Sequence, residues 1–132
     1  MNTRHLLCSL LVLLVTTTAT FAQKTNAEKL IGCWVLKSMN YSKPLPDKLK
    51  LSKEAMNSTV CFDTNGKFIT ELGGENPLTV KGNYNLSVDG KTLSQSREVK
   101  DQDIDEEAEI TQLDEKKLAL TLEFGTMIFE KK

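Results

Sequence analysis

Histidine is almost missing from this sequence of 132 residues, because its one histidine, His5, lies in a segment that we expect to be cleaved. Histidine is the commonest general base and a common transition-metal ligand. Without it, serine and cysteine triads lack their base, and the two cysteines left after cleavage are too few for a zinc site. Serine–lysine or carboxylate pairs stay chemically open, but no local pattern singles one out. We therefore expect no enzyme, no metal and no cofactor.

An excess of basic residues is also lacking, since 17 lysines and arginines face 18 aspartates and glutamates. Nucleic-acid binding needs cationic side chains that neutralise phosphates. We therefore expect no nucleic-acid partner, and the length suits a single domain.

The one long hydrophobic run, residues 6–15, lies near the start of the chain, after Arg4. The small residues Thr20 and Ala22 follow it, at positions that a signal peptidase reads. A run this short and early is typical of a secretory signal and not of a membrane span. We predict a signal peptide at 1–22 and a secreted or periplasmic domain at 23–132, without a transmembrane segment.

A competing interpretation is a lipoprotein anchored through Cys33, because residues 30–33, Leu-Ile-Gly-Cys, have the form of a bacterial lipoprotein box. Such a box directly adjoins the hydrophobic run, whereas Lys24 and Lys29 intervene here. We favour cleavage after Ala22.

Beyond residue 31, hydrophobic and polar residues alternate as they do in strands with one buried face. Asn-Gly and Asp-Gly pairs between the segments favour hairpins. We predict strands at 32–39, 58–63, 67–71, 80–88, 91–96, 106–112, 116–122 and 126–131. Eight such strands predict an all-β antiparallel barrel, with two packed sheets as the alternative.

The connection at 43–57 breaks this pattern, because it contains prolines and could form a short helix from Asp47 onward. In such a helix Leu49 and Met56 would turn inward.

Alternation also assigns the faces, since successive side chains of a strand point to opposite sides. The inner face contains Trp34, Leu36, Val60, Phe62, Phe68, Thr70, Tyr84, Leu86, Leu93, Ala108, Ile110, Leu118, Leu120, Leu122, Phe124, Met127 and Phe129. The outer face contains Lys37, Lys67, Glu71, Asn83, Asn85, Glu107, Glu109 and Lys131.

The helix-prone stretch 26–30 leads into Gly32-Cys33-Trp34, a G-x-W at the head of the first strand that resembles the lipocalin signature. Segments 60–68, 82–86 and 128–132 are similar to those of small secreted bacterial lipocalin-like domains. The resemblance implies an eight-stranded up-and-down barrel whose first strand closes against its last, and a role in holding a small apolar ligand. Lipocalins also pack an Arg or Lys from the last strand across the tryptophan; Lys131 is the one candidate here, but we assign it to the outer face.

Gly32 and Trp34 have a structural interpretation, in which the tryptophan plugs the base of the barrel. Direct contact between Trp34 and a ligand is the alternative. Cys33 and Cys61 each precede an inward aromatic residue, which places both on the outer face of neighbouring strands. An exported chain permits a disulfide between them, and two unpaired thiols out of register remain equally open.

Six inward aromatic residues favour a largely filled barrel with a modest pocket near residues 40–57. We predict that this pocket binds a small hydrophobic molecule, an acyl chain or a small aromatic, but not haem. The predicted walls are Leu36, Phe62, Phe68, Tyr84 and Phe129, with Leu49 and Met56 as a lid. The alternatives are a protein-binding module, such as a protease or lysozyme inhibitor, and an envelope-associated structural protein without a small ligand.

Residues 101–105 look like the opening of a calcium loop, but Glu106 and Gln112 stand where an EF-hand needs Gly and Glu. We interpret the segment as a solvated acidic connection between two strands, with a weak calcium site as the alternative. Sequons at Asn40, Asn57 and Asn85 matter only in a host that glycosylates exported proteins.

Overall fold

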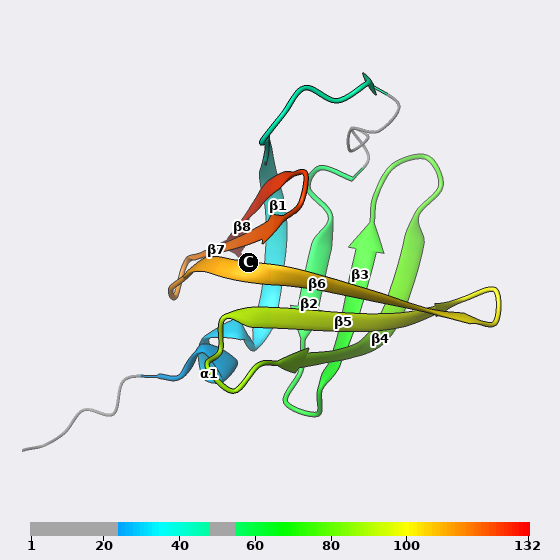
Figure 1. The fold of residues 1–132 in the computed structure, drawn as a ribbon. Coiled ribbons are helices and arrows are strands. Elements are labelled where there is room, and N and C mark those ends of the chain that lie inside the picture. Colours follow the sequence, from blue (N-terminus) through cyan, green and yellow to red (C-terminus); the bar gives the residue numbers. More distant parts are fainter. Residues whose placement is uncertain (1–23, 48–54) are drawn as a thin grey trace, which may run out of the picture.

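The computed structural model describes residues 24–47 and 55–132, and in this part of the chain eight antiparallel strands form a closed barrel (Figure 1). The elements are α1 (Asn26–Leu30), β1 (Gly32–Tyr41), β2 (Thr59–Phe62), β3 (Lys67–Leu72), β4 (Leu78–Leu86), β5 (Thr92–Val99), β6 (Gln102–Leu113), β7 (Lys117–Leu122) and β8 (Gly125–Lys131). Each strand pairs with the next, and β1 pairs with β8. The predicted up-and-down barrel is confirmed, and the alternative of two packed sheets is wrong.

The core lies inside the barrel because the alternation puts one apolar row of each strand there. On β1, Trp34 and Leu36 are buried while Lys37 is exposed. The buried apolar residues are Leu30, Trp34, Leu36, Val60, Phe62, Phe68, Leu93, Ala108, Ile110, Leu118, Ala119, Leu120 and Phe129. Phe124 was expected on the inner face, but it lies in the turn between β7 and β8.

The two ends of the barrel have different connections. At the end where β1 begins, which we call the closed end, short turns join β2 to β3, β4 to β5 and β6 to β7. Helix α1 lies at this end (Figure 1), and the Asn26 side-chain amide donates to the Gly90 carbonyl. The opposite end, the open end, has the connection from β1 to β2 and the hairpins β3–β4, β5–β6 and β7–β8.

Of the segment 101–105, only Asp101 lies in the connection, because β5 and β6 run further than the sequence predicts. Val99 pairs with Gln102, so a two-residue turn of Lys100 and Asp101 joins the strands. Both turn residues have positive φ, 49° and 62°, as a type I′ hairpin requires. The strand β6 thus contains Asp103 and Asp105, and the described residues include no group of side chains suited to a metal ion.

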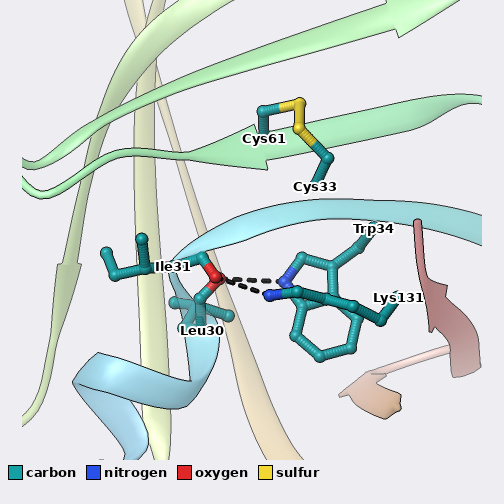
Figure 2. The surroundings of a disulfide bond; sticks show 6 residues. All are labelled: Leu30, Ile31, Cys33, Trp34, Cys61 and Lys131. Atoms are coloured by element: carbon teal, nitrogen blue, oxygen red, sulfur yellow. Dashed lines mark hydrogen bonds between the residues drawn. A yellow bond between two sulfur atoms is a disulfide. The ribbon is translucent and has the colours of Figure 1, made fainter. Parts of the chain in front are cut away.

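The disulfide is present: Cys33 and Cys61 are directly paired residues of β1 and β2, and their Cα atoms lie 4.0 Å apart. The two thiols are therefore in register, and the alternative of free, out-of-register thiols is wrong. Figure 2 shows the bond on the side of β1 opposite the Trp34 ring, as expected for the outer face.

Two predictions fall outside the described residues. The signal peptide at 1–22 is one, and the other is most of the expected helix in the first connection, including Leu49, since residues 48–54 are not described. In the described part of the chain, no helix has the length and apolar character needed to cross a membrane.

Candidate functional site

A cavity of about 180 Å³ lies inside the open end of the barrel. Its lining consists of Leu36, Ala55, Ser58, Val60, Phe62, Phe68, Thr70, Leu72, Gln95, Arg97, Ile104, Glu106, Leu120, Met127 and Phe129. For comparison, an apolar cavity of about 150 Å³ is large enough to bind benzene. The cavity therefore has room for one aromatic ring or a short acyl chain, and it opens to solvent at the mouth.

The floor of the cavity is apolar and well ordered by packing. The rings of Phe62 and Phe68 are neighbours, with centroids 6.5 Å apart and planes tilted by 44°. The Phe68 ring lies over Gly82 of β4, its Cα partner, where a Cβ would come within 2.7 Å of the ring. The same Cβ would meet the Ser96 carbonyl oxygen. Gly82 therefore lets the Phe68 ring approach the barrel wall more closely than any other residue would allow.

The rim beside the first connection is fixed by backbone hydrogen bonds to β1. Leu36 donates to the Ser58 carbonyl at 2.9 Å and accepts from the Asn57 amide at 2.9 Å. These bonds continue the pairing of β1 and β2 to the two residues that precede β2. They hold Ser58, which is buried, and Ala55 at the cavity wall.

One wall of the cavity is polar and belongs to β5 and β6. Gln95 and Arg97 alternate with outward residues of β5, as Ile104 and Glu106 do on β6. Nη2 of Arg97 lies 3.0 Å from Oε1 of Glu106. The two side chains are 34% and 46% exposed, so the ion pair sits at the mouth and is partly screened by water.

The closed end, in contrast, is filled. Trp34 is fully buried, and its Nε1 donates to the Leu30 carbonyl at 2.9 Å (Figure 2). Leu30 is fully buried as well, and neither residue is among those that line the cavity. The geometry is that of a plug at the barrel base.

Lys131 covers the Trp34 ring, so its expected outward orientation is wrong. Its Nζ lies 4.4 Å from the ring centroid and donates to the Ile31 carbonyl. Lys131 and Trp34 are Cα partners on β8 and β1, and paired residues share a face. Burial, with a smaller contribution from Lys24, lowers the pKa of the Lys131 ammonium.

Gly32 makes this contact sterically accessible. Its φ of 119° lies in the region that favours glycine, and a Cβ would come within 2.5 Å of Nζ of Lys131. A side chain at position 32 would therefore displace the lysine from the tryptophan.

The cavity brings together Leu36, Phe62, Phe68 and Phe129 of the predicted wall residues. Tyr84 lies elsewhere: its ring packs edge-on against Phe62, with centroids 5.0 Å apart, and its hydroxyl donates to the Asp63 carbonyl. Burial raises the pKa of the Tyr84 phenol, and the nearby Asp63 carboxylate adds to the increase.

The predicted lid is described only in part. Met56 packs against the core without lining the cavity, and Leu49 belongs to the residues that the structure does not describe.

The polar wall is the part that the sequence prediction missed. The inner positions of β5 follow from Leu93 in steps of two, which leads to Arg97. The same steps backward from Ala108 on β6 lead to Glu106 and Ile104. The signal was present in the alternation, but the predicted strands at 91–96 and 106–112 excluded Arg97 and Ile104, and Gln95 and Glu106 within them were assigned to neither face.

Solved structures with the same architecture exist. A lipocalin-like protein from Bacteroides uniformis is 19% identical to this chain, with a TM-score of 0.60 over 79% of this chain and 99% of that one. An uncharacterised protein from Bacteroides eggerthii is 16% identical, with a TM-score of 0.60 over 78% of this chain and 99% of that one. No protein-family model matches the sequence, and neither does any curated protein. The fold is therefore lipocalin-like, as the G-x-W resemblance implies.

Proposed function

We propose that this protein is a non-catalytic, exported binding protein that holds a small, mainly apolar molecule in the cavity of its open end. The observation that carries the proposal is the cavity itself, about 180 Å³ in volume and floored by buried apolar side chains. A barrel of eight strands can either be filled by its own side chains or hold one small ligand. Here the closed end is filled, whereas the open end holds the unfilled volume.

Export is supported by two features. Residues 1–22 have the composition of a secretory signal. The Cys33–Cys61 bond is of a kind that persists in oxidising compartments outside the cytoplasm.

The size of the cavity sets the expected affinity. Burial of one methylene contributes about 0.8 kcal/mol, so seven or eight buried carbons contribute about 6 kcal/mol, equivalent to a dissociation constant of about 0.1 mM or somewhat lower. Isothermal titration calorimetry tests this expectation with two probes. 1-Octanol represents an acyl chain, and toluene represents a small aromatic ligand.

The matched control is Val60→Phe, which places a ring in the cavity from the wall of β2. We expect wild type to bind at least one probe with a dissociation constant below about 100 μM, and Val60→Phe to bind tenfold more weakly. Failure of wild type to bind either probe would contradict the proposed function.

A protein partner is the second candidate, favoured by apolar side chains at the open end. Leu78 at the start of β4 is 55% exposed, and Val99 at the end of β5 is 40% exposed. A partner that inserts between these hairpins would contact both. Replacement of Leu78 and Val99 by Ser distinguishes the two functions, because it leaves the lining of the cavity and octanol binding unchanged.

A further inference from the structure

Among the described residues, the cavity lining contains one cationic side chain, Arg97, and one anionic side chain, Glu106. Both lie on the same wall, at the mouth, whereas the floor opposite the mouth is formed by Phe62, Phe68 and Phe129. A molecule that enters this cavity with an apolar tail thus leaves its other end beside the two charges. The arrangement selects for amphipathic molecules over purely apolar ones.

Of the two charged groups, Arg97 is better suited to a ligand. A guanidinium carries five N–H donors in a planar fork, and its fixed geometry matches a carboxylate. In this structure Nη2 contacts one oxygen, Oε1 of Glu106. A single oxygen at that fork leaves further N–H groups available to a second acceptor at the mouth.

We propose that the ligand is an amphipathic carboxylate, with a tail of about eight carbons in the cavity, whose head group binds Arg97. This proposal rests on the proposed function and specifies the ligand class. Glu106 orients the guanidinium while the cavity is empty. On binding, the ligand carboxylate accepts from the remaining N–H groups of Arg97, and its negative charge lies close to that of Glu106, so the two carboxylates repel each other.

The experiment compares octanoate with 1-octanol at pH 7.5 by calorimetry, since the two differ only in the head group. Arg97→Gln removes the proposed contact, and Glu106→Gln removes the repelling charge. Lys81→Gln is the matched control, because it removes one positive charge from an exposed position on β4, away from the cavity. Octanol affinity reports in every variant whether the cavity itself is intact.

We expect Arg97→Gln to weaken octanoate about tenfold, as for the loss of one hydrogen bond to a charged group, and to change octanol less than twofold. Glu106→Gln strengthens octanoate severalfold, and Lys81→Gln changes neither ligand. Octanoate binding also weakens as salt rises from 20 to 500 mM, whereas octanol binding does not weaken.

Equal effects of Arg97→Gln on the two ligands, or no effect on octanoate, would overturn the head-group contact while octanol binding still supports the proposed function. Failure of both ligands to bind wild type would overturn both proposals together.

Discussion

The two ends of this barrel are built on the same strands and the same alternation, yet only one of them encloses volume. At the closed end, Trp34 fills the interior, Lys131 covers its ring, and α1 adds Leu30 beneath it. At the open end, the inner positions of β5 and β6 include Arg97 and Glu106, whose side chains stay partly exposed to water. The comparison teaches that the size and polarity of a few inward residues decide whether such a barrel is a solid core or a pocket.

The turns of the closed end are also held by side-chain hydrogen bonds. At the closed end, three aspartates accept backbone hydrogen bonds within their own turns: Asp63 from Asn65 and Lys67, Asp89 from Lys91, and Asp114 from Lys116 and Lys117. Side-chain acceptors of this kind fix turns locally. The closed end is therefore ordered both inside and at its margin.

The largest expected effect follows from removal of the plug. Trp34→Ala should lower the free energy of unfolding by about 3–5 kcal/mol, because it deletes a fully buried indole and leaves a cavity. Met127→Ala at the open end should lower it by less, since Met127 is half-buried and already borders the pocket. Urea denaturation followed by circular dichroism measures both.

Should Trp34→Ala fail to fold, Trp34→Phe keeps a ring and removes the Nε1 donor to Leu30, at an expected loss of about 1–2 kcal/mol. Equal losses for the substitutions at positions 34 and 127 would contradict the distinction between the two ends.

The disulfide is expected to have the next largest effect. Cys33 and Cys61 are separated by 28 residues. In the chain-entropy model a bond that closes a loop of this length stabilises the fold by about 3.5 kcal/mol. The double variant Cys33→Ser, Cys61→Ser should lose about this amount and become insensitive to reductant, whereas reduction of wild type should give the same loss. A wild type whose stability does not change with dithiothreitol would refute the prediction.

Filling substitutions compare the packing of the ends directly. Ala108→Leu adds carbon atoms to a buried site toward the closed end and should cost about 1–3 kcal/mol, as for overpacking of a tight core. Val60→Phe adds a similar volume beside the cavity and should change stability by less than about 1 kcal/mol, because the ring enters unfilled space. Thermal denaturation of the two variants under one buffer condition makes the comparison, and an inverted order would show that the cavity is not available.

The smallest expected effect is on the stability of the protein at acidic pH. The Ser87 hydroxyl and then the Lys91 amide lower the pKa of Asp89, and the amides of Lys116 and Lys117 lower the pKa of Asp114. These carboxylates therefore contribute stability that is present above their unfolded pKa, about 3.9, and that is lost as pH falls through the lower folded values. Acid should thus weaken the closed end through its turns.

Asp89→Asn with Asp114→Asn should make the urea midpoint less sensitive to pH between 2 and 6, because the two groups no longer titrate. Glu109→Gln, which removes an exposed carboxylate from β6, is the control for charge alone. An unchanged pH profile in the double variant would contradict the assignment.

Much of the fold could be predicted because strand alternation and turn formation depend on residues that are close together in the sequence. Alternation with Asn-Gly and Asp-Gly turns predicted eight strands and the inward positions of Leu36, Phe62, Phe68 and Phe129, which meet at the cavity. Burial of apolar side chains is the dominant favourable contribution to the free energy of folding. The inward positions of these apolar residues can therefore be predicted from the sequence.

Some of the residues that were missed are charged, so burial of apolar side chains does not determine their positions. Arg97 and Glu106 point inward at a mouth exposed to water, so no apolar side chain marks these positions as inward. Lys131 has the same parity as the inward Phe129, so its assignment to the outer face applied the alternation wrongly. A lysine can bury its aliphatic stem along a ring while its ammonium reaches polar partners, here the Ile31 carbonyl. Residue class alone does not reveal such an arrangement.

Closure of β1 against β8 also determines where the chain leaves the barrel. The Lys132 amide donates to the Cys33 carbonyl at 2.9 Å, and Lys24, before α1, lies 3.7 Å from Glu115 in the turn between β6 and β7. Both points are at the closed end, so a linker fused at either position is attached opposite the mouth. A molecule immobilised on a sensor surface through residue 24 or 132 would thus present its cavity to the solution. A protein fused at either position would not block the path by which a ligand enters the mouth.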